Sequence, residues 1–174
     1  SSISDDQWTT GLVFCHLGTL SYVLGNYATA HSQLQESLQI FKALGDLRRV
    51  AIALAYLGTV THALGADHES WHYFHEALKL AIKTLATPVA LDVFIGMATL
   101  LVKVGGTARA LELLHLIIDH PAATMEAQNR AKHLLAELAS RIPPQVIAAA
   151  KEPGKTRTVE VVAAELLGAR EVAG

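Results

Sequence analysis

The sequence predicts an all-α protein, an α-solenoid of helical hairpins that repeats every 40 residues and ends in a C-terminal capping helix. The main observation is internal repetition: Leu17-Gly18-Thr19 recurs 40 residues later as Leu57-Gly58-Thr59, and Thr99 continues the series. The second is that apolar residues recur at three- and four-residue spacing within each unit, as they do in amphipathic helices. The same 40-residue spacing relates Leu24-Gly25 to Leu64-Gly65 and Val104-Gly105, Ala30 to Ser70 and Ala110, and Leu38 to Leu78 and Ile118.

Glycines mark the expected end of the first helix in each unit. Gly25, Gly65 and Gly105 follow the last periodic residue, where a Gly can take the left-handed conformation that stops a helix. Ser4 and Gln7 have the spacing of a capping box, which predicts the start of the first helix. The seven expected repeat helices lie near residues 4–24, 27–43, 46–64, 67–84, 87–104, 107–119 and 124–141.

Small residues recur where the two helices of a hairpin are expected to cross. Gly18 and Gly58 would let antiparallel helices approach closely, with the larger Leu34 and Phe74 filling the space beside them. This pattern predicts tight packing within each hairpin.

The C-terminal region has a different pattern. Pro143-Pro144 predicts a break, followed by a short helix that ends near Lys151 and a polar turn over residues 152–157. A last amphipathic helix, near residues 158–170, is expected to cover the open end of the stack. The predicted organisation is therefore about three and a half hairpins over residues 1–141 and a capping segment over residues 142–174.

Composition narrows the class of protein. Hydrophobic residues make up 51% of the 174 residues, but no uncharged apolar run approaches the length of a membrane span. The net charge of −2 gives no electrostatic reason to expect binding to nucleic acid or to anionic lipid. Lone Cys15 excludes an internal disulfide and fits a reducing, cytoplasmic location. The start at Ser1-Ser2, without a Met, is expected for a fragment of a longer protein.

The residues Leu17-Gly18, Gly25, Tyr27, Ala30 and Leu38 resemble the tetratricopeptide motif. The departures are the period of 40 in place of about 34, and the absence of a Pro after the first unit. The long units resemble the C-terminal repeat regions of bacterial signal-transduction ATPases of the STAND class and of LuxR- or AfsR-type transcriptional activators. The tail also resembles the end of those proteins, in 110–114, 120–122, 130–131, 134–138 and 143–144.

This resemblance implies a right-handed solenoid that serves as a non-catalytic sensor module of a larger regulatory protein. It implies a protein or peptide partner, such as the upstream nucleotide-binding domain of the parent chain, or a small-molecule inducer. The nucleotide-binding motifs of those families do not occur in the sequence, so no cofactor is expected. A constitutive scaffold or self-association module without a small ligand is the alternative.

Two patterns resemble functional motifs, a phosphate-binding loop and a Cys–His pair, but their context argues against both functions. Residues 149–156 approximate a phosphate-binding loop, but an Ala-rich helix precedes them and Pro153 removes one backbone donor. The neighbours Cys15 and His16 point about 100° apart on a helix, and no third group orients them for nucleophilic catalysis. No paired carboxylates or catalytic triad are evident, so the sequence does not predict an enzyme.

Three histidines share one helical face. His68, His72 and His75 have the spacing i, i+4 and i+7, which could bind zinc or nickel. Phe74, Ala77 and Ser70 define the packing side of this segment, so the histidines are expected on the outer, solvated surface. We therefore expect no metal centre there.

The inner surface, formed by the first helix of each pair, is the candidate binding site. In a repeat superhelix these helices line a continuous groove. A mixed small, polar and aromatic groove suits a peptide helix or a modest organic ligand. The recurring threonines either contact such a ligand or simply pack within the helices. The candidate groove residues are His16, Thr19, Tyr22, Tyr56, Thr59, His62, Ile95, Thr99 and Lys103.

Overall fold

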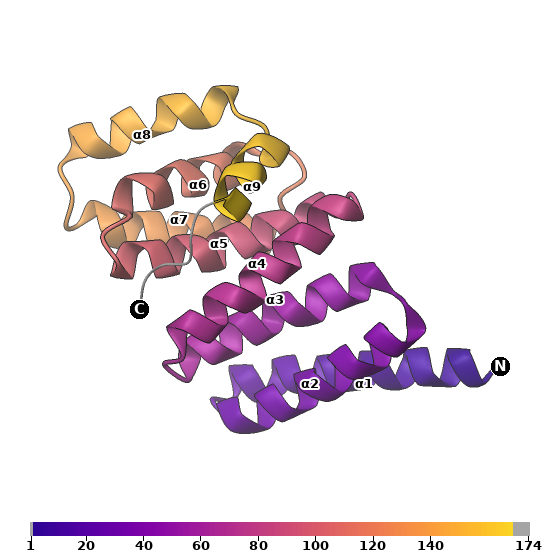
Figure 1. The fold of residues 1–174 in the computed structure, drawn as a ribbon. Helices are drawn as coiled ribbons and strands as arrows, with labels where there is room; N and C mark the ends of the chain where they lie inside the picture. The colour runs from indigo at the N-terminus through magenta and orange to yellow at the C-terminus, as the bar shows by residue number, and fades with distance from the viewer. Residues whose placement is uncertain (1, 169–174) are drawn as a thin grey trace.

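The computed structural model describes residues 2–168, apart from the side chains of residues 152–156. This part of the chain is all-helical and contains nine helices that pack in sequence (Figure 1). They are α1 (Ile3–Val23), α2 (Tyr27–Leu44), α3 (Leu47–Ala63), α4 (Asp67–Lys83), α5 (Thr87–Lys103), α6 (Thr107–Asp119), α7 (Met125–Ala139), α8 (Pro144–Thr156) and α9 (Val159–Gly168). None of these helices has both the length and the apolar content that crossing a membrane requires.

The helix ends follow the glycines. Gly25, Gly65 and Gly105 have φ of 80°, 81° and 86°, so each takes the left-handed conformation predicted for a residue that stops a helix. Leu85 takes the same conformation, with φ of 54°, at the end of α4. It lies 40 residues after Gly45, which has φ of 69°, so the second unit places a Leu where the first has a Gly.

The predicted capping box of α1 was wrong, although the helix begins within one residue of the predicted start. The capping box is formed by Ser2 and Asp5, not by Ser4 and Gln7. The Ser2 hydroxyl accepts from the Asp5 N–H at 3.2 Å, and the Ser2 N–H donates to Asp5 Oδ2 at 3.0 Å. Ser2 is therefore the N-cap and Asp5 the third helical residue, and their side chains satisfy the backbone N–H groups of residues 2 and 5 at the helix start.

Close helix packing occurs where the small residues predicted it. The pairs α1–α2, α3–α4 and α5–α6 pack together, and each second helix also packs against the first helix of the next pair. A Cβ on Gly18 would lie 2.6 Å from Leu34 Cγ, and one on Gly58 would lie 2.6 Å from Phe74 Cε1. These two glycines are therefore required for the observed approach of the helices.

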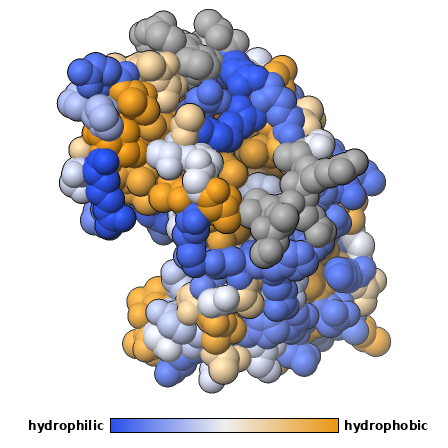
Figure 2. Space-filling model, turned by 60° about the vertical axis from the view of Figure 1, so that its left-hand side comes forward, coloured by the Kyte–Doolittle hydropathy of each residue, from blue (hydrophilic) through white to orange (hydrophobic). Residues whose placement is uncertain are grey.

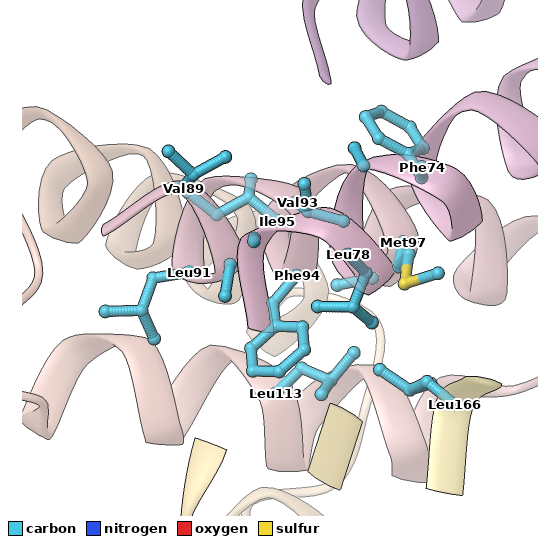
Figure 3. Close-up of a cluster of buried hydrophobic side chains, with 14 of the residues drawn as sticks. Phe74, Leu78, Val89, Leu91, Val93, Phe94, Ile95, Met97, Leu113 and Leu166 are labelled. Carbon is cyan, nitrogen blue, oxygen red and sulfur yellow. The ribbon is translucent and has the colours of Figure 1, made fainter. Parts of the chain in front are cut away.

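The odd-numbered helices also contact one another in order, α1 with α3, α3 with α5, and α5 with α7. Of the described helices, α5 contributes the most residues to the buried core, nine in all. Figure 3 shows Phe94 and Met97 of this helix with Leu113 of α6 and Leu166 of α9. The core thus joins elements from both the repeated and the C-terminal parts of the chain.

The C-terminal helices differ from the prediction. The expected turn at 152–157 is wrong because α8 continues to Thr156, and the backbone is helical through Pro153-Gly154. Helix α8 packs on α6 (Figure 1). Helix α9 packs against α4 and α5, whereas the sequence predicted that it would cover the end of the helix stack. The last predicted helix extended to Arg170, which lies outside the described residues.

Ion pairs connect α9 to α6. Arg109 of α6 pairs with Glu112, 2.8 Å from Nη1 to Oε2, and also with Glu165 of α9. Arg157 pairs with both of these glutamates. The ring of His75 on α4 contacts the Leu167 carbonyl at 3.2 Å. Helix α9 thus makes polar contacts through Glu165 and the Leu167 carbonyl in addition to the apolar contacts of its buried residues.

Candidate functional site

A cavity of about 270 Å³ lies between α3, α5 and α7. Its position follows from the packing of the odd-numbered helices, which brings the middle of α3 beside the first turns of α5 and α7. Thr124 caps α7 by accepting from the Ala127 N–H at 3.1 Å, which places the start of that helix at the rim. The lining residues are Ile52, Ala55, Tyr56 and Thr59 from the first wall, Pro88, Val89 and Asp92 from the second, and Thr124, Glu126 and Arg130 from the third.

Two carboxyl groups and one guanidinium line this cavity, those of Asp92, Glu126 and Arg130. Burial raises the pKa of Asp92 above its ordinary value, the Arg130 guanidinium partly opposes this, and Glu126 adds to it. Burial also raises the pKa of the Tyr56 phenol, which therefore keeps its proton at neutral pH. The cavity thus combines a half-buried carboxyl with a phenol and apolar walls.

Four of the predicted groove residues line this region. Tyr56 and Thr59 belong to the cavity, and Ile95 and Thr99 line a second, more open hollow of about 470 Å³. Arg130 lines both hollows and so lies between them. The face shown in Figure 2 interleaves hydrophilic and hydrophobic residues.

The threonine hydroxyls are engaged within their own helices. Thr19, Thr59 and Thr99 donate to the carbonyls of His16, Ala55 and Ile95 at 2.9, 3.2 and 3.0 Å. Their hydroxyl protons are therefore used locally, as Ser and Thr commonly do inside helices. A ligand could use only the remaining oxygen lone pairs.

The remaining groove candidates lie in separate clusters. Tyr22 packs against Tyr27, with ring centroids 5.7 Å apart, and His16 is exposed on α1. His62 Nδ1 lies 2.6 Å from Asp67 Oδ1, and Lys103 pairs with the same carboxylate. The Lys103 hydrogen bond, helped by His62, lowers the pKa of Asp67. The predicted strip is thus divided into the cavity region and two flanking clusters.

Sequence reasoning missed Asp92, Glu126 and Arg130. Asp92 had a usable signal, because it is the one acidic residue of α5, whose only other charged residue is Lys103. An isolated acid in an otherwise apolar helix needs a partner or a function. Glu126 and Arg130 had no such signal, since they lie on α7, for which the sequence showed no repeat match.

The histidine stripe does not converge on one point. The rings of His68 and His72 are 4.8 Å apart between centroids, but His75 turns to the Leu167 carbonyl under α9. Among residues 2–168, no group of three or more His, Cys, Asp or Glu is arranged to hold a metal ion. Cys15 is buried and burial raises the pKa of its thiol, which lowers its thiolate fraction.

Comparison with known proteins adds no relative. The sequence matches no family model, and neither a curated protein nor a solved structure matches it.

Proposed function

We propose that this protein is a non-catalytic binding module, a tetratricopeptide-like α-solenoid that senses a ligand through the cavity between α3, α5 and α7. The observation that supports this proposal is the half-buried Asp92 on the wall of a cavity with apolar sides. A carboxyl in this setting costs free energy unless something neutralises it, and a bound group can do so.

The chemistry of the cavity favours one kind of ligand. Ile52, Val89 and Pro88 offer apolar contact, while Asp92 and Glu126 accept hydrogen bonds or face a positive charge. The ring of Tyr56 can add a cation–π contact. A small molecule or peptide side chain with an apolar body and an amine therefore suits the cavity better than an anion.

A matched pair of probes tests this proposal. Phenethylamine and 3-phenylpropionate have similar apolar bodies and opposite charges. We expect the amine, but not the acid, to raise the Tm of the protein in proportion to its concentration. The variant D92N should abolish this shift, while D119N, a change at an exposed aspartate of α6, should leave it intact. Equal responses to both probes would contradict the proposal.

A regulatory role for the module rests on the sequence resemblance to the repeat regions of bacterial signalling ATPases and transcriptional activators. In that role the protein would act in the cytoplasm and dock on the nucleotide-binding domain of its parent chain. Light scattering of this chain, with and without such a domain, tests the role. A monomer that captures the domain supports a sensor. A constitutive oligomer that ignores the domain favours the alternative, a scaffold without a small ligand.

A further inference from the structure

The outer face of α1 exposes a row of large apolar side chains. Val13, Leu17 and Leu20 are 50%, 41% and 55% exposed, although their spacing places them on one side of the helix. Apolar residues occur all round α1, yet only Gly11, Cys15 and Gly18 are buried in it. A helix that is apolar all round is normally covered on every side.

The corresponding positions in the next two units are covered. Forty residues later, Ala53, Leu57 and Val60 of α3 are 0%, 0% and 1% exposed. In α5 the equivalent residues are also buried, with exposures of 0%, 0% and 4% for Val93, Met97 and Leu100. The exposed fraction at equivalent repeat positions is thus about half in α1 and close to zero in α3 and α5.

The difference arises from one missing neighbour. Helix α3 packs between α2 and α4, and α5 packs between α4 and α6. Helix α1 packs against α2 and α3, but within residues 2–168 no helix lies on its other side. The surface of α3 that packs against α2, and the surface of α5 that packs against α4, therefore have an equivalent on α1 that no described helix covers.

We propose that the outer face of α1, defined by Val13, Leu17 and Leu20, is a docking site for the second helix of another hairpin of this 40-residue type. That helix would stack on α1 as α2 stacks on α3. From Gln7 to Val23, α1 contains no Asp, Glu, Lys or Arg. The facing side of the docked helix is accordingly apolar and uncharged.

His16 of α1 also restricts the size of the side chain that faces it on the docked helix. Phe74 of α4 fits beside Gly96 of α5, where a Cβ would lie 2.6 Å from the ring atom Cε1. In α3 the equivalent residue is Tyr56, and α2 carries Leu34 in place of Phe74. In α1 this position is His16, so the docked helix needs an aliphatic residue there, as α2 has.

A second copy of the chain fits this surface less well. The sides of α2, α4 and α6 that match the face of α1 are already covered by α3, α5 and α7 within each copy. Among helices α1 to α6, a second copy offers only α1 with this side uncovered. An isologous dimer is therefore an outcome of the test and not the proposal.

Duplication of one repeat in the full chain tests the docking site. The extended protein has residues 1–46 followed by residues 7–174, which keeps the 40-residue spacing and places a copy of α2, with its Leu34, before the second α1. We expect the extended protein to have a higher Tm than the native chain. In hydrogen exchange, the amides of the second α1 should exchange at least tenfold more slowly than those of native α1.

Substitutions separate docking from general stabilisation. L17Q/L20Q should lower the Tm of the native chain by no more than about 3 °C, because both side chains are already about half exposed. In the second α1 of the extended protein the same pair should lower it by about 10 °C, because both side chains are then buried. The control L64Q changes the exposed residue that follows α3 as its C-cap, and should have equal, small effects in both proteins.

Two results would overturn the proposal. One is an inserted hairpin that stays unstructured, with the amides of α1 exchanging at the native rate and L17Q/L20Q acting equally in both proteins. The other is a dimer of the native chain, measured by light scattering, that L17Q/L20Q dissociates, since a second copy would then be the occupant. The first result leaves the ligand cavity untouched, and probe binding at Asp92 is measured separately.

Discussion

At the scale of single residues, Leu85 is the clearest departure from the pattern of its own sequence. Its left-handed conformation costs an L-residue roughly 1–2 kcal/mol, while Gly45 adopts the same conformation without that cost. The side chain is 85% exposed, so its removal loses little packing. L85G should therefore raise the free energy of unfolding by about 1 kcal/mol and the Tm by about 2–4 °C.

Thermal unfolding checks this prediction. L64G is the matched control, because Leu64 is also exposed at a helix end but has φ of −77°. It should lower the Tm, since Gly adds backbone entropy to the unfolded chain without relieving strain. A loss of stability in L85G similar to that in L64G would show that Leu85 is not strained.

Asp92 predicts a pH dependence of stability. Burial raises its pKa in the folded state, so the folded protein binds this proton more tightly than the unfolded chain does. Ionisation of Asp92 therefore costs stability. The cost is absent below the pKa of the unfolded chain and complete above the raised pKa of the folded protein. D92N should raise the Tm at pH 7, and this gain should vanish toward acid pH.

The comparison of D92N with native protein between pH 4 and pH 8 measures this effect. The charged groups that face Asp92 are Arg130 and Glu126, both from α7. D119N should show no such dependence. A D92N curve parallel to the native one would exclude a raised pKa.

At the scale of helices, the contact between α4 and α5 depends on Gly96. An Ala there gains helix propensity of about 1 kcal/mol, but its Cβ would collide with the ring of Phe74. Overpacking of this kind costs about 1–3 kcal/mol. G96A should lower the Tm in the native background and raise it in F74L, because a Leu leaves space for the added methyl group.

A double-mutant cycle by thermal or urea unfolding measures that reversal of sign. G168A is a suitable control, because a Cβ on Gly168 meets nothing within 4 Å. Additive effects of G96A and F74L would show that the two residues are not in steric conflict.

Helix α9 is predicted to depend on apolar contact more than on its ion pairs. Leu166 is buried in the central cluster (Figure 3), whereas Glu165 sits at the surface with Arg109 and Arg157. L166A should cost about 3 kcal/mol and lower the Tm by about 10 °C. E165Q should have a small effect that disappears at high salt, because exposed pairs are screened.

Unfolding of both variants at low and high salt distinguishes the two contributions, and hydrogen exchange reports whether α9 detaches. V161A provides a matched control, since Val161 lies on the exposed side of the same helix. A larger loss in E165Q than in L166A would reverse this assignment.

The sequence predicted local features well and long-range contacts poorly. The bounds of all seven predicted repeat helices agree with the structure to within two residues. Glycines in the left-handed conformation determine the local backbone at the ends of α1, α2, α3 and α5. Pro153-Gly154 suggested a turn, yet α8 continues through it. The docking of α9 on α4 and α5 joins distant parts of the chain, and no periodicity of the sequence specifies such a contact. Leu166 belongs to the buried cluster shown in Figure 3.

At the scale of the whole molecule, the helices are unequal in burial. Helix α5 has nine buried residues and α1 only three, so the free energy needed to open the chain should rise from its first helix toward its centre. The cavity residues come from both local and distant parts of the chain. Tyr56 and Thr59 were found because the repeat placed them, whereas Arg130 reaches the cavity only through the packing of α7 beside α5.

Cys15 offers a direct measurement of this gradient. Its thiol is 6% exposed between α1 and α2, and burial raises its pKa, so a thiol reagent should react only after α1 opens. We expect labelling of Cys15 to require much less free energy than exchange of the α5 amides, and to increase with urea less steeply than global unfolding does. In the extended protein with a copy of α2 stacked on the second α1, the Cys15 of that helix should react at least tenfold more slowly than in the native chain. Labelling as slow as α5 exchange in the native chain would mean that the molecule opens as one cooperative unit, with α1 as firmly held as the centre.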